Sequence, residues 1–180
     1  MNIRVRKAEI YESEMIAHIG KISFKAAFQK VFNNCNLNEY IKKVYDPVII
    51  KRSFERRNNI YFIAEINERP IGFAHVKRFS LNDEIESGSQ MQLEKIYVLP
   101  EYQRKGTGNA LLNEVIEFAK AIGPDYLWLD VYTGNEHAIR FYEKNGFTVA
   151  SIYDRGIGSQ YFEFYMMMLP VHVDEFLCCL

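Results

Sequence analysis

Residues 93–108 of the chain read LEKIYVLPEYQRKGTG. The first part has the composition of a β-strand and stops at Pro100, and a short polar segment with two glycines follows. Beyond the glycines, apolar residues recur at helical spacing as far as Ile122. The sequence therefore predicts a strand over 92–98, a glycine-containing turn and a helix over 106–122.

The turn before this helix has the composition of an anion site. Gly106 and Gly108 lack the Cβ atoms that would keep a ligand away from the backbone. Unpaired N–H groups and the dipole at a helix start favour an anion such as pyrophosphate, and Arg104 and Lys105 add charge. Neither the Walker pattern nor the dinucleotide pattern Gly-x-Gly-x-x-Gly is present. The alternative is a glycine-containing helix start without a ligand.

The rest of the chain alternates between helical and strand-like spacing. Asn33–Asn36 is expected to break the first helix, 81–89 to form a flexible acidic connection, and 154–158 to join the last two strands. The remaining predicted elements are a strand over 3–6, a helix over 12–28 and a helical region over 37–56 that is irregular around Pro47. They are followed by a hairpin of 60–66 and 71–76, a strand over 126–131, a helix over 135–145 and a closing hairpin of 147–153 and 161–169.

A chain of 180 residues fits one domain, and neither an internal repeat nor a shift in composition marks a boundary. We expect a single mixed α/β domain over 1–170 and a tail over 171–180 that contains Cys178 and Cys179. The sequence leaves three alternatives for the tail: packing on the domain, packing on a second subunit in a homodimer, or mobility.

Composition excludes several classes of protein. The formal charge of −1 lacks the basic surplus of a protein that binds nucleic acid through its phosphates. No apolar stretch reaches the ~18 residues of a membrane-spanning helix, and the first residues lack the apolar core of a secretion signal. The 3 cysteines make no disulfide framework, and the histidines have no metal-like spacing. We expect a cytoplasmic protein without a metal, a membrane partner or a nucleic-acid partner.

Residues 93–108 closely resemble the acetyl-CoA motif of the GCN5-related N-acetyltransferases, in which a strand precedes Gln/Arg-x-x-Gly-x-Gly/Ala and a helix. Residues 128–131, Asn135 and 138–147 are similar to the family's next strand, its Asn-x-x-Ala-x-x-x-Tyr helix and the Gly-Phe that follows. The resemblance covers roughly 60–169. It implies a central, largely antiparallel twisted sheet whose central strands run parallel and splay apart, flanked by helices.

The resemblance implies acetyl-CoA as co-substrate, and it assigns the contacts residue by residue. Backbone groups of one strand would hold the pantetheine arm and the thioester carbonyl, and amides of the turn would hold the pyrophosphate. A side-chain amide would bind the cofactor, and a lysine would reach a phosphate or the adenine end. In this chain these groups are Ile96, Tyr97 and Val98 on the strand, Arg104, Lys105, Gly106, Thr107, Gly108 and Asn109 in the turn, then Asn135 and Lys144.

The resemblance also implies acid–base roles. Tyr142 matches the tyrosine that donates a proton to the departing thiolate, for which a phenol with a pKa near ~10 is suited. Its alternative is a core aromatic, because Phe141 shares its apolar stripe. A base must also remove a proton from the acceptor, because only a neutral amine can attack the thioester. The candidates are Glu94, which the sequence favours, and Asp130, which stands where the ribosomal-protein acetyltransferases have a glutamate; the alternative for both is a structural role.

The acceptor implied by the resemblance is the primary amine of a small molecule. Residues 23–28 and Tyr40 are similar to the first helices of the PaiA-type spermidine/spermine acetyltransferases, and Asp83, Glu84 and Glu86 would attract a polyamine unless they form only a solvated loop. We expect polyamine acetylation, with two alternatives. One is acetylation of protein N-termini, and the other is a CoA-binding regulatory module without catalysis.

Overall fold

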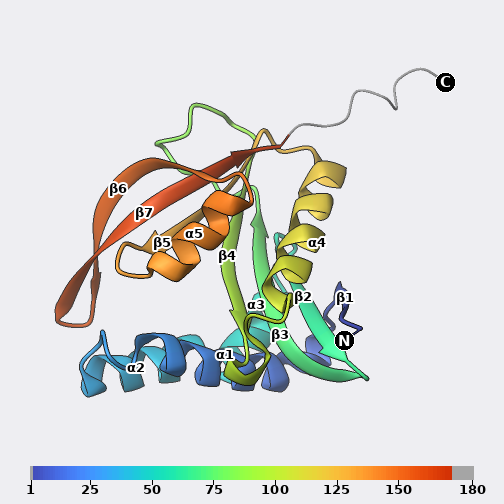
Figure 1. The fold of residues 1–180 in the computed structure, drawn as a ribbon, viewed down its shortest axis with the longest axis vertical. Helices are drawn as coiled ribbons and strands as arrows, with labels where there is room; N and C mark the ends of the chain where they lie inside the picture. The colour runs from blue at the N-terminus through green and yellow to red at the C-terminus, as the bar shows by residue number, and fades with distance from the viewer. Residues whose placement is uncertain (1, 172–180) are drawn as a thin grey trace.

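The computed structural model describes residues 2–171, and the seven strands in this part of the chain form one sheet (Figure 1). Their order is β1 (Arg4–Lys7), β2 (Asn59–Ile66), β3 (Arg69–Arg78), β4 (Gln90–Val98), β5 (Tyr126–Tyr132), β7 (Gln160–Pro170) and β6 (Thr148–Ile157). Strands β4 and β5 run parallel, and all other neighbouring pairs are antiparallel. The predicted mixed α/β class, with parallel strands inside a largely antiparallel sheet, is confirmed.

Helices cover both faces of the sheet (Figure 1). One face carries α4 (Thr107–Ile122) and α5 (Glu136–Lys144), and the other carries α1 (Ser13–Phe28), α2 (Asn34–Val44) and α3 (Pro47–Phe54). Short 3-10 turns lie at Ile10–Glu12 and Pro100–Tyr102, before α1 and before the turn that leads into α4.

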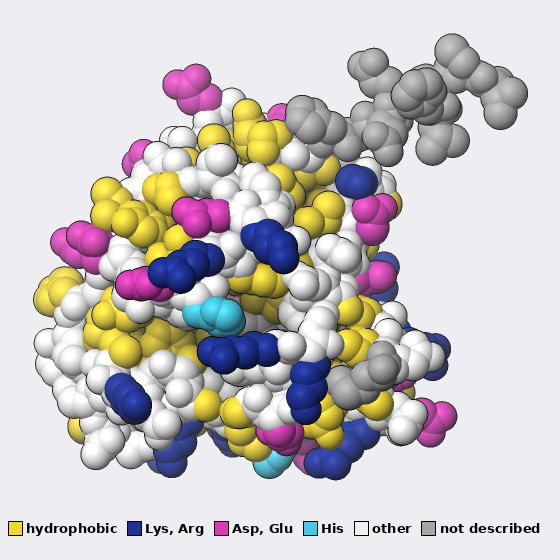
Figure 2. All heavy atoms as spheres, viewed as in Figure 1, with side chains coloured by type: hydrophobic (Ala, Val, Ile, Leu, Met, Phe, Trp, Pro, Cys, Tyr) yellow, Lys and Arg dark blue, Asp and Glu magenta, His cyan; other side chains and the backbone are white. Residues whose placement is uncertain are grey.

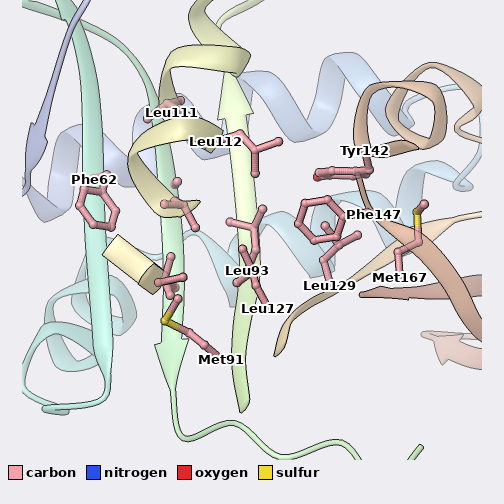
Figure 3. Close-up of a cluster of buried hydrophobic side chains, with 14 of the residues drawn as sticks. Phe62, Met91, Leu93, Leu111, Leu112, Leu127, Leu129, Tyr142, Phe147 and Met167 are labelled. Atoms are coloured by element: carbon pink, nitrogen blue, oxygen red, sulfur yellow. The ribbon is translucent and has the colours of Figure 1, made fainter. Parts of the chain in front are cut away.

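Alternation along β2 supplies a core on each face. Phe62 packs in the core beneath α4, whereas Tyr61 and Ile63 pack in the core beneath α1–α3. This follows because successive strand side chains point to opposite faces of a sheet. Figure 3 shows the first core, where Leu111 and Leu112 of α4 lie over the sheet. The sheet is therefore buried on both sides near its centre.

The two parallel strands separate soon after they meet. β4 pairs with β5 only from Gln90 to Gln92, opposite Tyr126 to Trp128. On its other side, β4 has a bulge, because Leu93 pairs with Val76 and Lys95 pairs with His75, which leaves Glu94 without a partner in β3. The edge of β4 that faces β5 is therefore free of strand pairing from residue 93 onward.

The helical region predicted over 37–56 is two helices, α2 and α3, and the second begins at Pro47, where an irregularity was expected. Pro47 occupies the first turn of α3, where a backbone N–H has no helical partner, and Asp46 caps that helix by accepting a backbone hydrogen bond at 2.7 Å. Asn33 caps α2 by accepting a hydrogen bond from the amide of Asn36 at 2.8 Å. The segment expected to break the first helix therefore starts the next one.

The predicted connection over 154–158 is wrong. Residues 154–157 continue β6 and pair with residues 160–163 of β7, so the hairpin turn is at Gly158 and Ser159. Gly158 has a φ of 60°, in the left-handed region that glycine favours. Aspartate and glycine are poor strand formers, but cross-strand pairing outweighs that preference here.

Residues 172–180 lie outside the described residues, and with them the prediction for the tail and its two cysteines. The domain limits of 1–170 and 171–180 therefore stay a prediction. No helix within residues 2–171 combines the length and the apolar composition needed to cross a bilayer.

Gly20 of α1 provides a test of the packing between α1 and the segment that joins α2 to α3. A Cβ atom at this position would overlap the ring of Tyr45, which is fully buried. We expect Gly20→Ala to lower the free energy of unfolding by about 1–3 kcal/mol, and Tm by roughly 2–4 °C per kcal/mol, because the tyrosine must shift. Gly88→Ala is the matched control, since its Cβ would meet no described atom within 4 Å. Thermal unfolding followed by circular dichroism checks this, and equal Tm values for the two variants would contradict it.

Candidate active site

A cavity of about 780 Å³ opens where β4 and β5 separate. Its walls come from α1 and α2, from the free edge of β4, from β5 and α5, and from the β6–β7 hairpin. Asn36 ties α2 to this hairpin, because its Nδ2 donates to the carbonyl of Ile157 at 3.3 Å and to Oε1 of Gln160 at 3.0 Å. The hairpin and the first helices thus enclose a space beside the central strands.

The cavity brings together one part of the predicted site and leaves out another. Its lining includes six of the predicted residues, which are Glu94, Ile96, Tyr97, Asp130, Asn135 and Tyr142. Val98, residues 104–109 and Lys144 are not part of the lining. The residues predicted to act on the thioester therefore share the cavity, whereas those predicted to bind phosphate lie outside it.

Tyr142 lies on α5, with its ring over Phe147 and its hydroxyl directed toward β4 (Figure 3). Only 8% of the residue is exposed, and this burial raises the pKa of the phenol. The hydroxyl forms no hydrogen bond with any group between residues 2 and 171. Tyr142 is therefore protonated at neutral pH and has a free donor at the cavity wall.

Glu94 sits at the bulge of β4 between two lysines. Its carboxylate accepts from Nζ of Lys77 at 2.6 Å and from Nζ of Lys95 at 2.9 Å. Burial by itself would raise the pKa of the carboxyl, but the two ammonium groups outweigh it and lower the pKa to about 2. Glu94 therefore stays ionised at neutral pH and is a weak proton acceptor.

Asp130 lies on β5, across the cavity from the bulge. Its Oδ2 accepts a hydrogen bond from Nη2 of Arg155 at 2.7 Å, and its side chain is 10% exposed. Its other oxygen, Oδ1, is buried and has no hydrogen-bond partner among the described residues. A buried carboxylate oxygen without a partner is unfavourable, so Asp130 is suited to accept a hydrogen bond from a ligand.

The turn before α4 presents unpaired amides. Gly106 precedes the helix with a φ of 89°, a conformation that glycine adopts without strain. Within the described part of the chain, the main-chain N–H groups of residues 104–109 donate to no partner. Arg104 and Lys105 are exposed, and Figure 2 shows Lys and Arg side chains gathered over α5 and the start of α4. These amides, the helix dipole and the cations fit a pyrophosphate.

Asn135 joins the helix start to the cavity. Its Oδ1 accepts a hydrogen bond from the amide of Ala138 at 3.2 Å and caps α5, while the residue also lines the cavity. Its Nδ2 is left to donate to a ligand, as the resemblance implies. Capping and ligand binding are compatible because they use different atoms of one side chain.

The acidic connection before β4 does not take part in the cavity. Asp83, Glu84 and Glu86 are exposed and do not contribute to its lining. Gln90 organises this connection, because its Nε2 donates to three carbonyls of the loop, and Ile85 is buried beneath it. The loop expected to be flexible is therefore held by specific hydrogen bonds, away from the cavity lining.

Four cationic side chains of the cavity were not predicted, namely Lys43, Lys77, Lys95 and Arg155. Lys77 lies one residue beyond the strand predicted over 71–76, and Arg155 falls in the segment mistaken for a connection. A sequence signal existed for Lys95, because two adjacent charges, Glu94 and Lys95, interrupt a strand that is otherwise largely apolar. Such charges inside a central strand indicate a cavity or an ion pair.

The Glu94 cluster gives a prediction about pH and stability. The folded-state pKa of about 2 lies below the ordinary value of 4.5, so the ion pairs stabilise the fold above about pH 4.5 and lose this effect as the pH falls toward about 2. We expect Glu94→Gln to be less stable than the wild type at neutral pH, with a difference that shrinks over this interval. Urea unfolding at a series of pH values measures it.

Glu136→Gln is the control for this experiment, because Glu136 forms an exposed ion pair with Arg140. Exposed pairs contribute only about 0–1 kcal/mol, so this variant should stay close to the wild type. A stability difference for Glu94→Gln that is constant across the pH range would show that the ion pairs are not its cause.

Comparison with known proteins agrees with this geometry. A spermidine N(1)-acetyltransferase of Thermoplasma acidophilum is 26% identical over 153 residues, which cover 83% of this chain and 90% of the relative. An uncharacterized N-acetyltransferase of Methanocaldococcus jannaschii is 30% identical over 124 residues, or 69% of this chain, and the match spans about half of that relative, 54%.

The fold has solved counterparts. The crystal structure of the PaiA N-acetyltransferase of Thermoplasma acidophilum in complex with coenzyme A superimposes with a TM-score of 0.75 and 25% identity, covering 94% of this chain and 99% of that one. The model of the acetyltransferase (GNAT) family matches residues 23–147. The chain therefore belongs to the GNAT family of acetyltransferases.

Proposed function

We propose that this protein transfers an acetyl group from acetyl-CoA to a primary amine. The observation that carries the proposal is the position of the Tyr142 hydroxyl, a free donor in the same cavity as Ile96 and Tyr97 of the unpaired β4 edge. A proton donor beside a free strand edge is the arrangement that acyl transfer from a thioester requires.

Residues of this chain are suited to hold the successive parts of the co-substrate. The amides of residues 104–109 would bind the pyrophosphate, with Arg104, Lys105 and Lys144 nearby as exposed cations. Backbone groups of residues 96–98 would bind the pantetheine arm, since β5 does not pair with them. Nδ2 of Asn135 would donate to the arm from the opposite wall. When bound, acetyl-CoA supplies an acetyl group activated as a thioester.

The acid in this proposal is Tyr142. As the amine nitrogen forms its bond to the acetyl carbon, the carbon–sulfur bond breaks and the phenol gives its proton to the departing thiolate. Burial holds the phenol in its protonated form until that moment, because it raises the pKa of Tyr142. A positioned acid of this kind contributes typically about 10²–10⁴-fold in rate.

We assign the role of base to Asp130 rather than Glu94. Asp130 has a carboxylate oxygen without a partner among the described residues, whereas both oxygens of Glu94 accept from lysines. The pKa of about 2 also makes Glu94 a poor acceptor for the proton that the amine must lose. Asp130 would take this proton, directly or through a water molecule. Glu94 would instead hold Lys77 and Lys95 in place.

For the acceptor, a polyamine is the first class to assay. The support comes from the spermidine N(1)-acetyltransferase of Thermoplasma acidophilum, which is similar over most of both chains. The acidic residues Asp83, Glu84 and Glu86 add no support, because they lie outside the cavity lining. A small-molecule amine is favoured over a folded protein by the enclosure of the cavity between the helices and the β6–β7 hairpin.

Release of free CoA in the presence of acetyl-CoA and a panel of amines tests the proposal. We expect Tyr142→Phe to lower kcat by about 10²–10⁴-fold, because the variant cannot protonate the thiolate, while calorimetry shows unchanged affinity for CoA. Tyr161→Phe is the control, since Tyr161 is 81% exposed and does not line the cavity. An unchanged rate for Tyr142→Phe would remove this residue from the mechanism.

Other outcomes of the panel would favour the alternatives. Binding of acetyl-CoA without turnover on any polyamine, amino acid or peptide would contradict the proposal and favour a CoA-binding regulatory module. Turnover on peptide N-termini but on no small amine would favour acetylation of protein N-termini.

A further inference from the structure

Arg155 is a charged cavity residue without a role in the proposed reaction. It lies on β6, the outermost strand, and reaches across β7 to Asp130 on β5. Its Nη2 donates to Oδ2 of Asp130 at 2.7 Å and also to the hydroxyl of Tyr153. The guanidinium carbon lies 5.0 Å from the ring centre of Phe164 and 5.4 Å from that of Tyr153. Two aromatic rings and one carboxylate thus fix the orientation of the guanidinium.

Part of this guanidinium is available to a ligand. Both recorded hydrogen bonds of the group use Nη2, and Nε and Nη1 donate to no group within residues 2–171. The side chain is 47% exposed and contributes to the cavity lining. The two bidentate edges of a guanidinium both include Nη2, so the unused donors, Nε and Nη1, offer single hydrogen bonds to different sides of the group. Nη1 of Arg155 is therefore an oriented cationic donor that can form a charge-assisted hydrogen bond with a carboxylate oxygen.

The charges of the cavity favour an acceptor that brings its own anion. Glu94 is neutralised by Lys77 and Lys95, and Asp130 is paired with Arg155. The charged side chains of the lining are the cations Lys43, Lys77, Lys95 and Arg155 and the carboxylates Glu39, Glu94 and Asp130, which leaves one net positive charge. A polycation would meet repulsion here, whereas a molecule with one ammonium and one carboxylate would not.

The remaining wall suits an apolar body. Phe24, Phe28 and Tyr132 line the cavity on the side of α1 and β5, and their rings contact one another through Phe28. An acceptor that extends from the charged groups toward α1 would place an apolar side chain against these rings.

We propose that the acceptor is an amine that carries a carboxylate on an apolar skeleton, as an apolar amino acid does, and that Arg155 binds this carboxylate. The inference rests on the proposed acetyl transfer and deepens it, because it names the class of acceptor. Arg155 is in this view a specificity-determining residue. It selects zwitterionic amines over polyamines and over amines without an anionic group.

The test compares two acceptors that differ only in the anion, L-phenylalanine and L-phenylalaninamide, with spermidine as the third. We expect kcat/KM to be about 10- to 100-fold higher for the acid than for the amide, since one charge-assisted hydrogen bond is at stake. The amide has the less basic amine and is more readily deprotonated, so this bias works against the expected result. Equal values, or a preference for the amide or for spermidine, would overturn the inference.

The variant Arg155→Gln tests whether the preference for the acid over the amide depends on Arg155. Because the variant also leaves Asp130 without its partner, the readout is the ratio of kcat/KM for acid and amide, which cancels any common loss. We expect this ratio to fall by about 10- to 100-fold. Arg140→Gln is the matched control, because Arg140 also pairs with a carboxylate but is 75% exposed on α5 and outside the cavity lining. A ratio that Arg155→Gln leaves unchanged would refute the role of Arg155.

Calorimetry separates this inference from the proposed function. Binding of the acid and the amide is measured to the wild type saturated with CoA, so no turnover is needed. If no amine is acetylated but the acid binds more tightly in a manner that depends on Arg155, the carboxylate site stands and the proposed function fails. If amines are acetylated but acid and amide bind equally, the function stands and the carboxylate site is refuted.

Discussion

Hydrogen bonding between β4 and β5 ends at Gln92 and Trp128, and the site depends on this separation. Two parallel strands that stay paired would satisfy each other's backbone groups and leave no space between them. Here β4 turns away at the bulge of Glu94, and its edge from residue 93 onward is free of strand pairing. The cavity, the unpaired strand edge and the exposed start of α4 all follow from this geometry.

Most charged side chains inside the cavity form an ion pair with a neighbouring side chain of opposite charge. Lys77 and Lys95 hold Glu94, and Arg155 holds Asp130, so none of these side chains presents a full charge to a ligand. Partly buried ion pairs of this kind orient groups more than they stabilise the fold. What is left for a ligand is a set of unused hydrogen-bonding positions: the hydroxyl of Tyr142, one oxygen of Asp130 and Nη1 of Arg155. Chemistry and selectivity in our proposals come from these positions.

Sequence patterns predicted those parts of the fold that local interactions specify. The helix over 106–122, the strand over 126–131 and the glycine turn between strand and helix are found within one or two residues of their predicted limits. Asn135 and Tyr142 were predictable as neighbours, because seven residues span about two turns of α5 and place both side chains on the cavity wall. An irregularity around Pro47 was predictable as well, but the start of a separate helix there and the extent of β6 were not, since they depend on capping by Asp46 and on pairing with β7.

By itself, then, the sequence determined the class of fold, the order of its elements and the turn suited to bind a diphosphate, because periodicity, glycine and helix ends act over a few residues. The tertiary structure alone decided the charge of the cavity. Lys77 is 17 residues from Glu94 in the sequence, and Arg155 is 25 residues from Asp130. No local sequence pattern predicts that these side chains pair across strands of the sheet. Whether a carboxylate is a free base or half of an ion pair depends on such distant partners, because a pKa responds to the charges that folding places beside it.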